Sequence, residues 1–390
     1  MASALTSTNS GPGLFGLRDS NRDFTKPKFW GKNQFNSSFP ASLACYFGYK
    51  NLQPIYLTLD TNLKIAHHKI DVLDLFGLRP IASSGTYDYQ TTPNLHFNFE
   101  SVFVPHALFA IGQVPRVDLI TQSSRDRTHL LRALEVKLTA LPDNQTYALT
   151  EDKYGCELVV RPDTIVYLAL NIAALYQTEQ SLLLSILNPV CTAIANWQDA
   201  AQVYPLLRAM CAALDNVLQL KLSQQSPLLM QPIWKTRGKT QILADDCFDL
   251  FVWSDFGFTR LFVDITKRTS APVITRSARS VVWLTKMLYD FSRAGKFEHK
   301  TIIDTLTYNT RNDKAFAIGG VGTNPYMASA ALVKPRLPKE ALRDIILGGG
   351  QYFLSPERRL DAAIMNSRMF PDPPTGTIMP PAPDAEEAER

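Results

Sequence analysis

Three ionisable residues lie inside two apolar segments of the sequence, where unpaired charge is costly. Asp118 falls within VPRVDLIT (114–121), and Glu135 and Lys137 fall within LEVKLTAL (134–141). Both segments alternate apolar and polar residues as half-buried strands do, which puts Glu135 and Lys137 on one face, about 6–7 Å apart. If the two strands pair, all three groups meet on that face. Two carboxylates would repel each other there, and a divalent cation such as Mg²⁺, which prefers oxygen ligands, would relieve the repulsion.

Similar spacings occur elsewhere in the chain and are weaker candidates. One is PDNQTYALTEDK (142–153), a polar segment typical of a turn, and the other is DFSRAGKFEHK (290–300). The second belongs to a helical stretch, in which positions i and i+2 do not face one another. Glu100, in HFNFESVFV, is a further acid that could support a metal site, although an exposed strand glutamate is the simpler interpretation. For Asp118, Glu135 and Lys137 the alternative is an exposed sheet face with a surface ion pair.

The elements that must position these residues follow from hydrophobic periodicity. We expect strands in residues 52–59, 96–104, 114–121, 134–141 and 156–161, and a second strand-like region in residues 249–265. We expect helices over 63–78, over 163–223 with Asp163 as an N-cap, and over 275–307. This order predicts an α/β (α+β) protein with a central mixed β-sheet flanked by helices, plus a largely helical insertion or second lobe.

The composition indicates an ordinary globular protein, with 45% hydrophobic and 19% charged residues and no internal repeat. Residues 1–40 are polar and predict an N-terminal arm, and residues 371–390 are rich in proline and acids and predict a disordered tail. Between them we expect a core in residues 41–180 that carries the three residues. A helical and mixed region, 181–370, would complete the fold and contribute partner contacts.

The five cysteines are odd in number and far apart, without a C-x-x-C pair, which favours reduced thiols in the cytoplasm. The N-terminal residues MASALTSTNSGPG do not have the basic and apolar regions of a signal peptide. The longest apolar segment, TIVYLALNIAALY, is shorter than the ~20 residues of a membrane-spanning helix. The sequence therefore predicts a cytoplasmic protein with no membrane partner.

The residues PRVD (115–118) followed by EVK (135–137) resemble the PD-(D/E)xK nuclease signature, with two extra residues between proline and aspartate. Together with FGLRP (76–80), ALEVKLTALPD (133–143) and CELVVRPDT (156–164), they resemble the HindVP/HgiDI group of type II restriction endonucleases. The motif is matched residue by residue, whereas the wider likeness covers most of the chain more loosely.

The resemblance implies a restriction-endonuclease-like core and a Mg²⁺-dependent, sequence-specific cleavage of double-stranded DNA that leaves 5′-phosphates. Asp118 and Glu135, with the backbone carbonyl of Val136, would hold Mg²⁺, and Lys137 would orient or help to deprotonate the attacking water. It also implies a degenerate palindrome such as GRCGYC, and a palindrome is read most simply by a homodimer. A cognate DNA methyltransferase would be a genetic partner.

Basic residues on loops are candidates for DNA contacts, although such clusters are usually solvated surface. The net charge of +4 fits a nucleic-acid partner without arguing for one. Two other functions stay open: a repair or structure-specific nuclease of the same fold, and a non-catalytic DNA-binding or scaffold protein. The candidate contacts form three clusters: Lys235, Arg237 and Lys239; Lys267, Arg268, Arg276 and Arg279; and Arg311, Asn312 and Lys314.

Overall fold

The computed structural model describes part of the chain, and the statements below concern that part. The expected arm (1–40), the expected tail (371–390), Lys239 and the cluster at 311–314 lie outside the described residues. The described residues are 54–70, 72–76, 95–123, 130–138, 158–231, 234–237, 240–243, 246–248, 251–269, 272–308, 310, 316–318 and 335–338.

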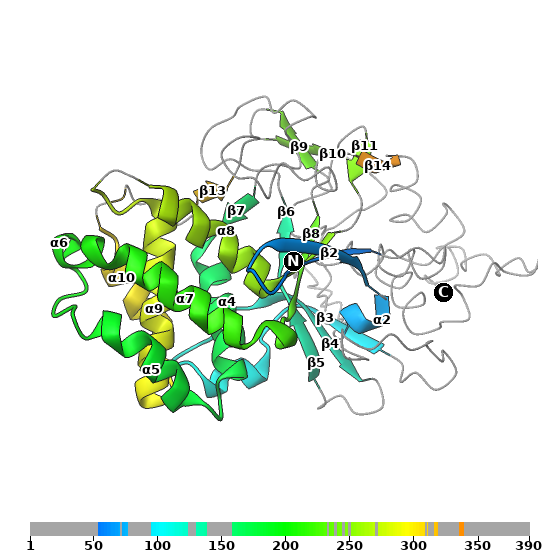
Figure 1. The fold of residues 1–390 in the computed structure, drawn as a ribbon. Helices are drawn as coiled ribbons and strands as arrows, with labels where there is room; N and C mark the ends of the chain where they lie inside the picture. The colour runs from blue at the N-terminus through cyan, green and yellow to red at the C-terminus, as the bar shows by residue number, and fades with distance from the viewer. Residues whose placement is uncertain are drawn as a thin grey trace, which may run out of the picture.

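The larger sheet has five strands in the order β2-β1-β12-β8-β6 (Figure 1). Two neighbouring pairs, β1 with β12 and β6 with β8, are parallel, and the other two pairs are antiparallel, so the sheet is mixed as expected. Its strands are β1 (Ile55–Leu59), β2 (Ile65–Lys69), β6 (Val136–Leu138), β8 (Pro227–Gln231) and β12 (Phe251–Ser254).

A second, antiparallel sheet consists of β3 (Leu95–Ser101), β4 (Val117–Ser123) and β5 (Leu130–Leu134) in that order. The segment 130–138 serves both sheets, because β5 pairs with β4 and, after Glu135, β6 pairs with β8. The expected pairing of the two chemistry-bearing strands is confirmed only in part. Of the strand expected at 134–141, only Leu134 belongs to β5 and pairs with β4, whereas Lys137 lies in β6, which pairs with β8 in the larger sheet. Smaller two-stranded ladders join β7 (Leu158–Val160) to β13 (Phe316–Ile318), β9 (Trp234–Arg237) to β10 (Thr240–Leu243), and β11 (Asp246–Phe248) to β14 (Pro335–Pro338).

The helices gather on one side of the molecule and the two main sheets on the other (Figure 1). Helix α9 lies at the centre of the helical group and packs against α4, α5, α7, α8 and α10, while α8 also packs on β1, β8 and β12. The helical stretches expected at 163–223 and 275–307 are thus confirmed. The helices are α4 (Pro162–Leu175), α5 (Gln180–Cys191), α6 (Ala200–Val203), α7 (Leu207–Leu220), α8 (Asp255–Arg268), α9 (Arg276–Ala294) and α10 (His299–Thr305).

Local sequence signals set the ends of the long helices. The Ser254 hydroxyl accepts a hydrogen bond of 2.8 Å from the amide of Gly257 at the start of α8, and Thr275 caps α9 in the same way. Helix α9 ends at Gly295, whose φ of 73° is left-handed and whose N–H bonds to the Phe291 carbonyl at 2.7 Å. Helix α4 begins after Arg161, and Asp163 lies in its first turn, so the expected N-cap at Asp163 is wrong.

The helix expected over residues 63–78 is also wrong. Residues Ile65–Lys69 form β2, and only the four residues Val72–Leu75 (α2) are helical. The cause is a tight turn before β2, in which the Asp60 carboxylate accepts hydrogen bonds from the amides of Asn62 and Lys64, and Leu63 has a positive φ of 56°. The turn returns the chain antiparallel to β1, and this overrides the helical spacing of the apolar residues.

The strand-like region expected at residues 249–265 is strand only in Phe251–Ser254 and continues as α8. Aromatic and β-branched residues favour a strand throughout this segment, but Ser254 begins a helix by capping the amide of Gly257. The prediction of a strand over this segment is therefore wrong after Ser254, where the Ser254 side chain caps a helix and the strand hydrogen bonds end.

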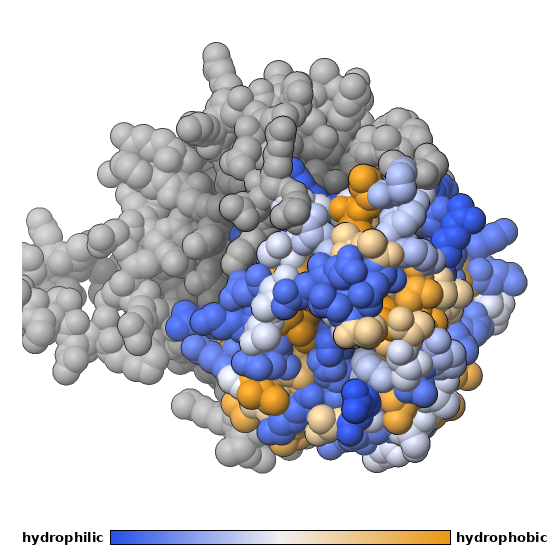
Figure 2. Space-filling model, turned by 90° about the vertical axis from the view of Figure 1, so that its left-hand side faces the viewer, coloured by the Kyte–Doolittle hydropathy of each residue, from blue (hydrophilic) through white to orange (hydrophobic). Residues whose placement is uncertain are grey.

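Seen from the helical side, the surface carries apolar residues as separate patches among polar ones (Figure 2). Leu182, Leu220 and Val273 are among the large apolar residues that are exposed in the described parts of the chain. In those parts, no helix is both long and apolar enough to span a membrane.

Candidate active site

Asp118 and Glu135 lie opposite each other where β4 begins and β5 ends. Leu119 pairs with Leu134 across the two strands, so Asp118 and Glu135 occupy the next opposite positions. The amide of Val136, which belongs to the peptide bond between Glu135 and Val136, donates a hydrogen bond of 2.8 Å to Oδ2 of Asp118. The Asp118 carboxylate therefore lies beside the backbone of Glu135.

The burial of the first segment agrees with the expected alternation, and that of the second does not. Val117 and Leu119 are buried, whereas Asp118 between them is half-buried. Leu134 and Val136 are buried on the second segment, and Glu135 is also largely buried, with 8% of its surface exposed. A carboxylate this enclosed needs a compensating partner, which makes Glu135 more than an ordinary surface acid.

Lys137 lies in β6, where it pairs in register with Met230 of β8. Its side chain is outside the described residues, so the structure fixes its place on the strand and not its contacts. Glu100 likewise lies in β3 with its side chain undescribed.

The donor set suits a hard cation, because carboxylate and carbonyl oxygens are the ligands that Mg²⁺ prefers. Two acids and one backbone carbonyl are the implied protein ligands, which leaves positions for water and phosphate oxygens. Among the described residues no group of three or more His, Cys, Asp or Glu side chains is arranged to hold a metal. The candidate set of two carboxylates is consistent with that finding and fits a site completed by backbone, water and substrate.

A cluster of polar side chains lies next to β5, the strand that ends just before Glu135. Asn171 of α4 donates from Nδ2 to Oδ2 of Asp255 at 2.9 Å, and its Oδ1 lies 3.1 Å from Nε2 of His106. From one turn earlier in α4, the Tyr167 hydroxyl donates to the Ala133 carbonyl at 3.1 Å. Sequence patterns missed this group because its residues come from η2 (Val104–Leu108), β5, α4 and α8, with no shared spacing.

The charges in this group perturb one another. Burial raises the pKa of the Asp255 carboxyl well above its usual value, and the nearby Arg132 guanidinium and the hydrogen bond from Asn171 oppose that rise. The negative charge of Glu135 adds to the rise, which places Glu135 within electrostatic reach of Asp255. Burial also lowers the pKa of His106 to about 4, so His106 is neutral at pH 7.

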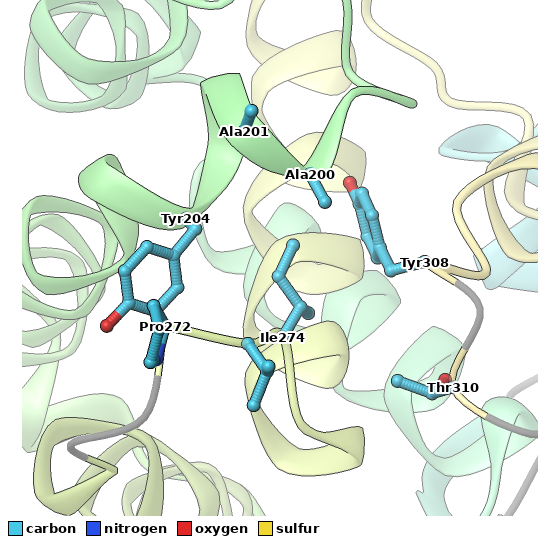
Figure 3. A pocket seen from close by; sticks show the side chains of 8 residues that line it. Ala200, Ala201, Tyr204, Pro272, Ile274, Tyr308 and Thr310 are labelled. Atoms are coloured by element: carbon cyan, nitrogen blue, oxygen red, sulfur yellow. The ribbon is translucent and has the colours of Figure 1, made fainter.

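A separate pocket of about 500 Å³ lies near the helical end of the molecule (Figure 3). It is lined by α6, by the segment before α9 and by Tyr204, Tyr308 and Thr310. The described residues that line it include no carboxylate, histidine or lysine.

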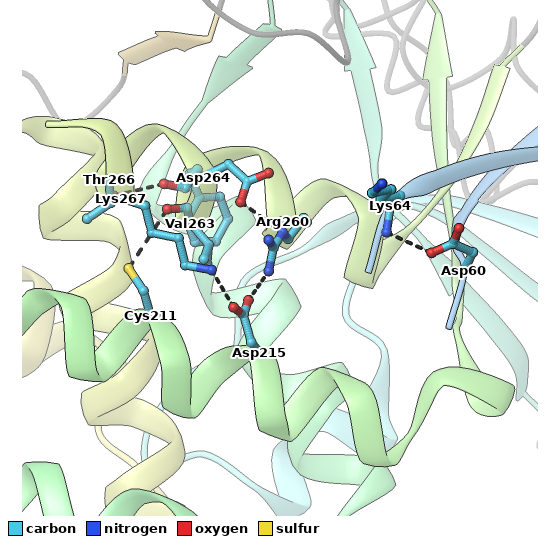
Figure 4. Close-up of polar contacts among 10 residues, drawn as sticks. Asp60, Lys64, Cys211, Asp215, Arg260, Val263, Asp264, Thr266 and Lys267 are labelled. Carbon is cyan, nitrogen blue, oxygen red and sulfur yellow. Dashed lines mark hydrogen bonds and ion pairs between the residues drawn. The ribbon is translucent and has the colours of Figure 1, made fainter. Parts of the chain in front are cut away.

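The second basic cluster is partly engaged within the protein. Lys267 and Arg260 of α8 both form ion pairs with Asp215 of α7 (Figure 4). Arg279 is buried, donates to Thr310 and lies 4.7 Å from the ring centre of Trp283. These contacts give Arg279 a structural role inside the protein, and its contact with DNA stays a prediction.

Other candidate DNA contacts have a defined backbone position. Arg268 is exposed in the last turn of α8, and Arg276 is half-buried in the first turn of α9. Lys235 and Arg237 lie on β9 with undescribed side chains, paired in register with Ile242 and Thr240. Their contact with DNA stays a prediction.

Comparisons with known proteins show the class. Residues 30–370 match the family model described as HindVP restriction endonuclease. The chain is 44% identical to the type II restriction enzyme HgiDI of Herpetosiphon aurantiacus, over 91% of this chain and 96% of that protein. It is 40% identical to the probable type II restriction enzyme HindVP of Haemophilus influenzae, over 92% and 95% of the two chains. No solved structure matches.

These similarities span nearly the whole chain and identify an enzyme of the type II restriction class. Within that class, the chain belongs to the HindVP restriction endonuclease family, which confirms the resemblance seen in its sequence.

Proposed function

We propose that this enzyme cuts double-stranded DNA at a site made of Asp118, Glu135 and Lys137, and that it needs Mg²⁺ to do so. The observation that carries the proposal is the Asp118 carboxylate held 2.8 Å from the amide that follows Glu135. This contact places the Asp118 carboxylate beside the backbone of Glu135, and Lys137 follows two residues later in the sequence.

Each residue has a distinct proposed role. Asp118 and Glu135, with the backbone carbonyl of Val136, would hold Mg²⁺. The bound ion would polarise the scissile phosphate and offset the charge that develops on its oxygens. Lys137 would orient the attacking water and stabilise its deprotonated form, and the products would carry a 5′-phosphate and a 3′-hydroxyl.

The remaining parts of the proposal follow from the family resemblance. We propose a restriction-endonuclease-like core of the PD-(D/E)xK type, in line with a mixed sheet on which a helix packs and with Asp118 and Glu135 placed where the chain passes into that sheet. The target would be a degenerate palindrome such as GRCGYC, read by a homodimer in which each subunit cuts one strand. The enzyme would act in the cytoplasm beside a cognate DNA methyltransferase encoded with it.

Digestion of plasmid DNA with Mg²⁺ or with EDTA tests the activity. Discrete bands that depend on Mg²⁺ and end in 5′-phosphates support the proposal, and sequencing the ends gives the site. Nicks or a smear would indicate a repair or structure-specific nuclease instead, and a mobility shift without cleavage would indicate a binding protein. Sizing the protein with and without a DNA duplex tests the dimer, and a monomer in both would contradict it.

A further inference from the structure

Two side chains hold the backbone where the chain passes from one sheet to the other. On one side the amide of Val136 donates to Asp118 at 2.8 Å, and on the other the hydroxyl of Tyr167 donates to the carbonyl of Ala133 at 3.1 Å. Glu135 lies between these two bonds. Its backbone position therefore depends on both of them as well as on the two ladders.

Among the described strands, β5 lies at the edge of its sheet and pairs with β4 alone. Backbone groups on its other edge therefore need a partner from elsewhere in the fold. The Ala133 carbonyl is buried together with the Tyr167 hydroxyl that bonds to it. A buried carbonyl left without a partner is costly, and here the partner comes from a helix.

Tyr167 is well suited to fix that carbonyl because its own position is defined. It lies in the middle of α4, a helix that is apolar on nearly every face and buried. Its ring packs edge-on against His106 with centroids 6.1 Å apart, and Asn171, one turn later, bonds to both His106 and Asp255. The hydroxyl is thus held by groups from η2, α4 and α8.

The hydroxyl also keeps its proton. Burial raises the pKa of Tyr167 well above its usual value, and the charges of Asp255 and Glu135 raise it further. Tyr167 therefore keeps its proton at neutral pH and can donate it to Ala133.

From this arrangement we propose that Tyr167 is a positioning residue for Glu135: its hydroxyl fixes the Ala133 carbonyl and so sets where the Glu135 carboxylate meets that of Asp118. The inference rests on the proposed function, because it requires Glu135 to bind the metal. One buried hydrogen bond contributes only about 1 kcal/mol to stability. A displacement of about 1 Å in a catalytic group can cost on the order of a hundredfold in rate. A positioning role and a purely structural role therefore predict different measurements.

The test compares Tyr167→Phe with Tyr176→Phe. Tyr176, the residue after α4, is equally buried, and its hydroxyl donates to the carbonyl of Val217 at 2.7 Å, between α4 and α7. Both changes remove one buried hydroxyl bond to a backbone carbonyl and leave the ring. Only one of them touches the strand that carries Glu135.

We expect Tyr167→Phe to lower the single-turnover rate of plasmid cleavage by about ten- to a hundredfold. DNA affinity, measured by mobility shift in EDTA, should stay within about twofold, and so should the cleavage rate of Tyr176→Phe. A readout without catalysis is the rise in melting temperature that Mn²⁺ causes in the protein alone. That rise should be smaller in Tyr167→Phe than in Tyr176→Phe.

A second variant guards against loss of folding. Asn171→Leu keeps the Tyr167 hydroxyl but removes the amide that orients its surroundings, and it should reduce the Mn²⁺ effect in the same direction. Equal cleavage rates and equal Mn²⁺ effects in the two tyrosine variants would overturn the inference. So would rates that fall only in proportion to melting temperature.

Glu135→Gln, measured alongside, separates this inference from the proposed function. If Glu135→Gln cleaves DNA like the unmodified enzyme, the proposed function fails and the inference fails with it. If Glu135→Gln is inactive and Tyr167→Phe matches Tyr176→Phe, only the inference fails. In the Glu135→Gln background, Tyr167→Phe should cause no further loss of the Mn²⁺ effect, because a residue that acts through Glu135 is not additive with it.

Discussion

Oδ2 of Asp118 accepts a hydrogen bond from the amide of Val136, a residue 18 positions later in the sequence. The bond holds the half-buried Asp118 of β4 against the backbone beside the buried Glu135, which lies between β5 and β6.

Asp118→Ala and Glu135→Ala should each lower cleavage by about a hundredfold or more, because each removes a charge that would stabilise the reacting phosphate through the metal. DNA binding in EDTA should be retained or tighter, since a carboxylate next to a phosphate is repulsive. Mobility shifts and plasmid digestion measure the two effects. Asp290→Asn, which changes an acid in an i,i+4 pair with Lys286 on α9, is the control and should cut normally. Normal cutting by both alanine variants would refute the site.

Lys137→Ala should also stop cleavage but should leave metal binding largely unchanged, because the proposed role of Lys137 is on the water and not on the ion. The Mn²⁺-induced rise in melting temperature, compared with that of Glu135→Ala, is the measurement. A variant that loses cleavage and the metal effect together would place Lys137 among the groups that support the metal.

The ion pairs between α7 and α8 should contribute measurably to stability. Asp215 accepts from both Arg260 and Lys267, and none of the three side chains is more than 33% exposed. Asp215→Ala should lower the free energy of unfolding by about 2 kcal/mol, the scale of a charge-assisted hydrogen bond. Asp290→Ala removes a single i,i+4 pair and should cost no more than about 0.5 kcal/mol. Urea denaturation measures the free energy of unfolding of both variants. Equal decreases in the two variants would show that Asp215, which pairs with two cations, contributes no more than Asp290, which pairs with one.

His106 should make the protein less stable in mild acid. Its pKa is about 4 in the folded chain, against 6.5 as the usual value, because it is buried. Between these two values the unfolded chain binds a proton that the folded chain does not, so stability is present above pH 6.5 and falls as the pH drops toward 4. The loss attributable to His106 is about 3 kcal/mol over that window.

The measurement is the free energy of unfolding at pH 7 and at pH 4.5 for the unmodified protein and for His106→Gln. The difference between the two pH values should be smaller in His106→Gln, because glutamine can donate to Asn171 without titrating. His68→Gln, at an exposed position on β2, should leave the pH dependence as it is. An unchanged slope in His106→Gln would contradict the assigned burial effect.

The sequence was most informative where alternation was strict. Val117 and Leu119 are buried on either side of the half-buried Asp118, as the pattern predicts for β4. Around Glu135 the pattern predicts one strand over 134–141, whereas the chain passes at Glu135 from β5 to β6 and Glu135 is itself buried. The same method failed at Ile65–Lys69, because apolar spacing cannot reveal the turn that begins at Asp60, five residues before Ile65.

Polar side chains that act on the backbone explain the other differences. Ser254 converts an apparent strand into a helix through one hydrogen bond, which no hydrophobic pattern records. Tyr167 and Asn171 lie in a helix whose composition predicts only burial, and their partners, Ala133 and Asp255, are 34 and 84 positions away. Their role depends on tertiary contacts and becomes visible only when the elements are placed in space.

Glu135 sits where a single run of chain leaves the three-stranded sheet and enters the five-stranded one. The Glu135 carboxylate can take its position only when both sheets are intact. Loosening of either sheet should therefore abolish cleavage, while the helices, which pack among themselves around α9, still give a full helical circular-dichroism signal.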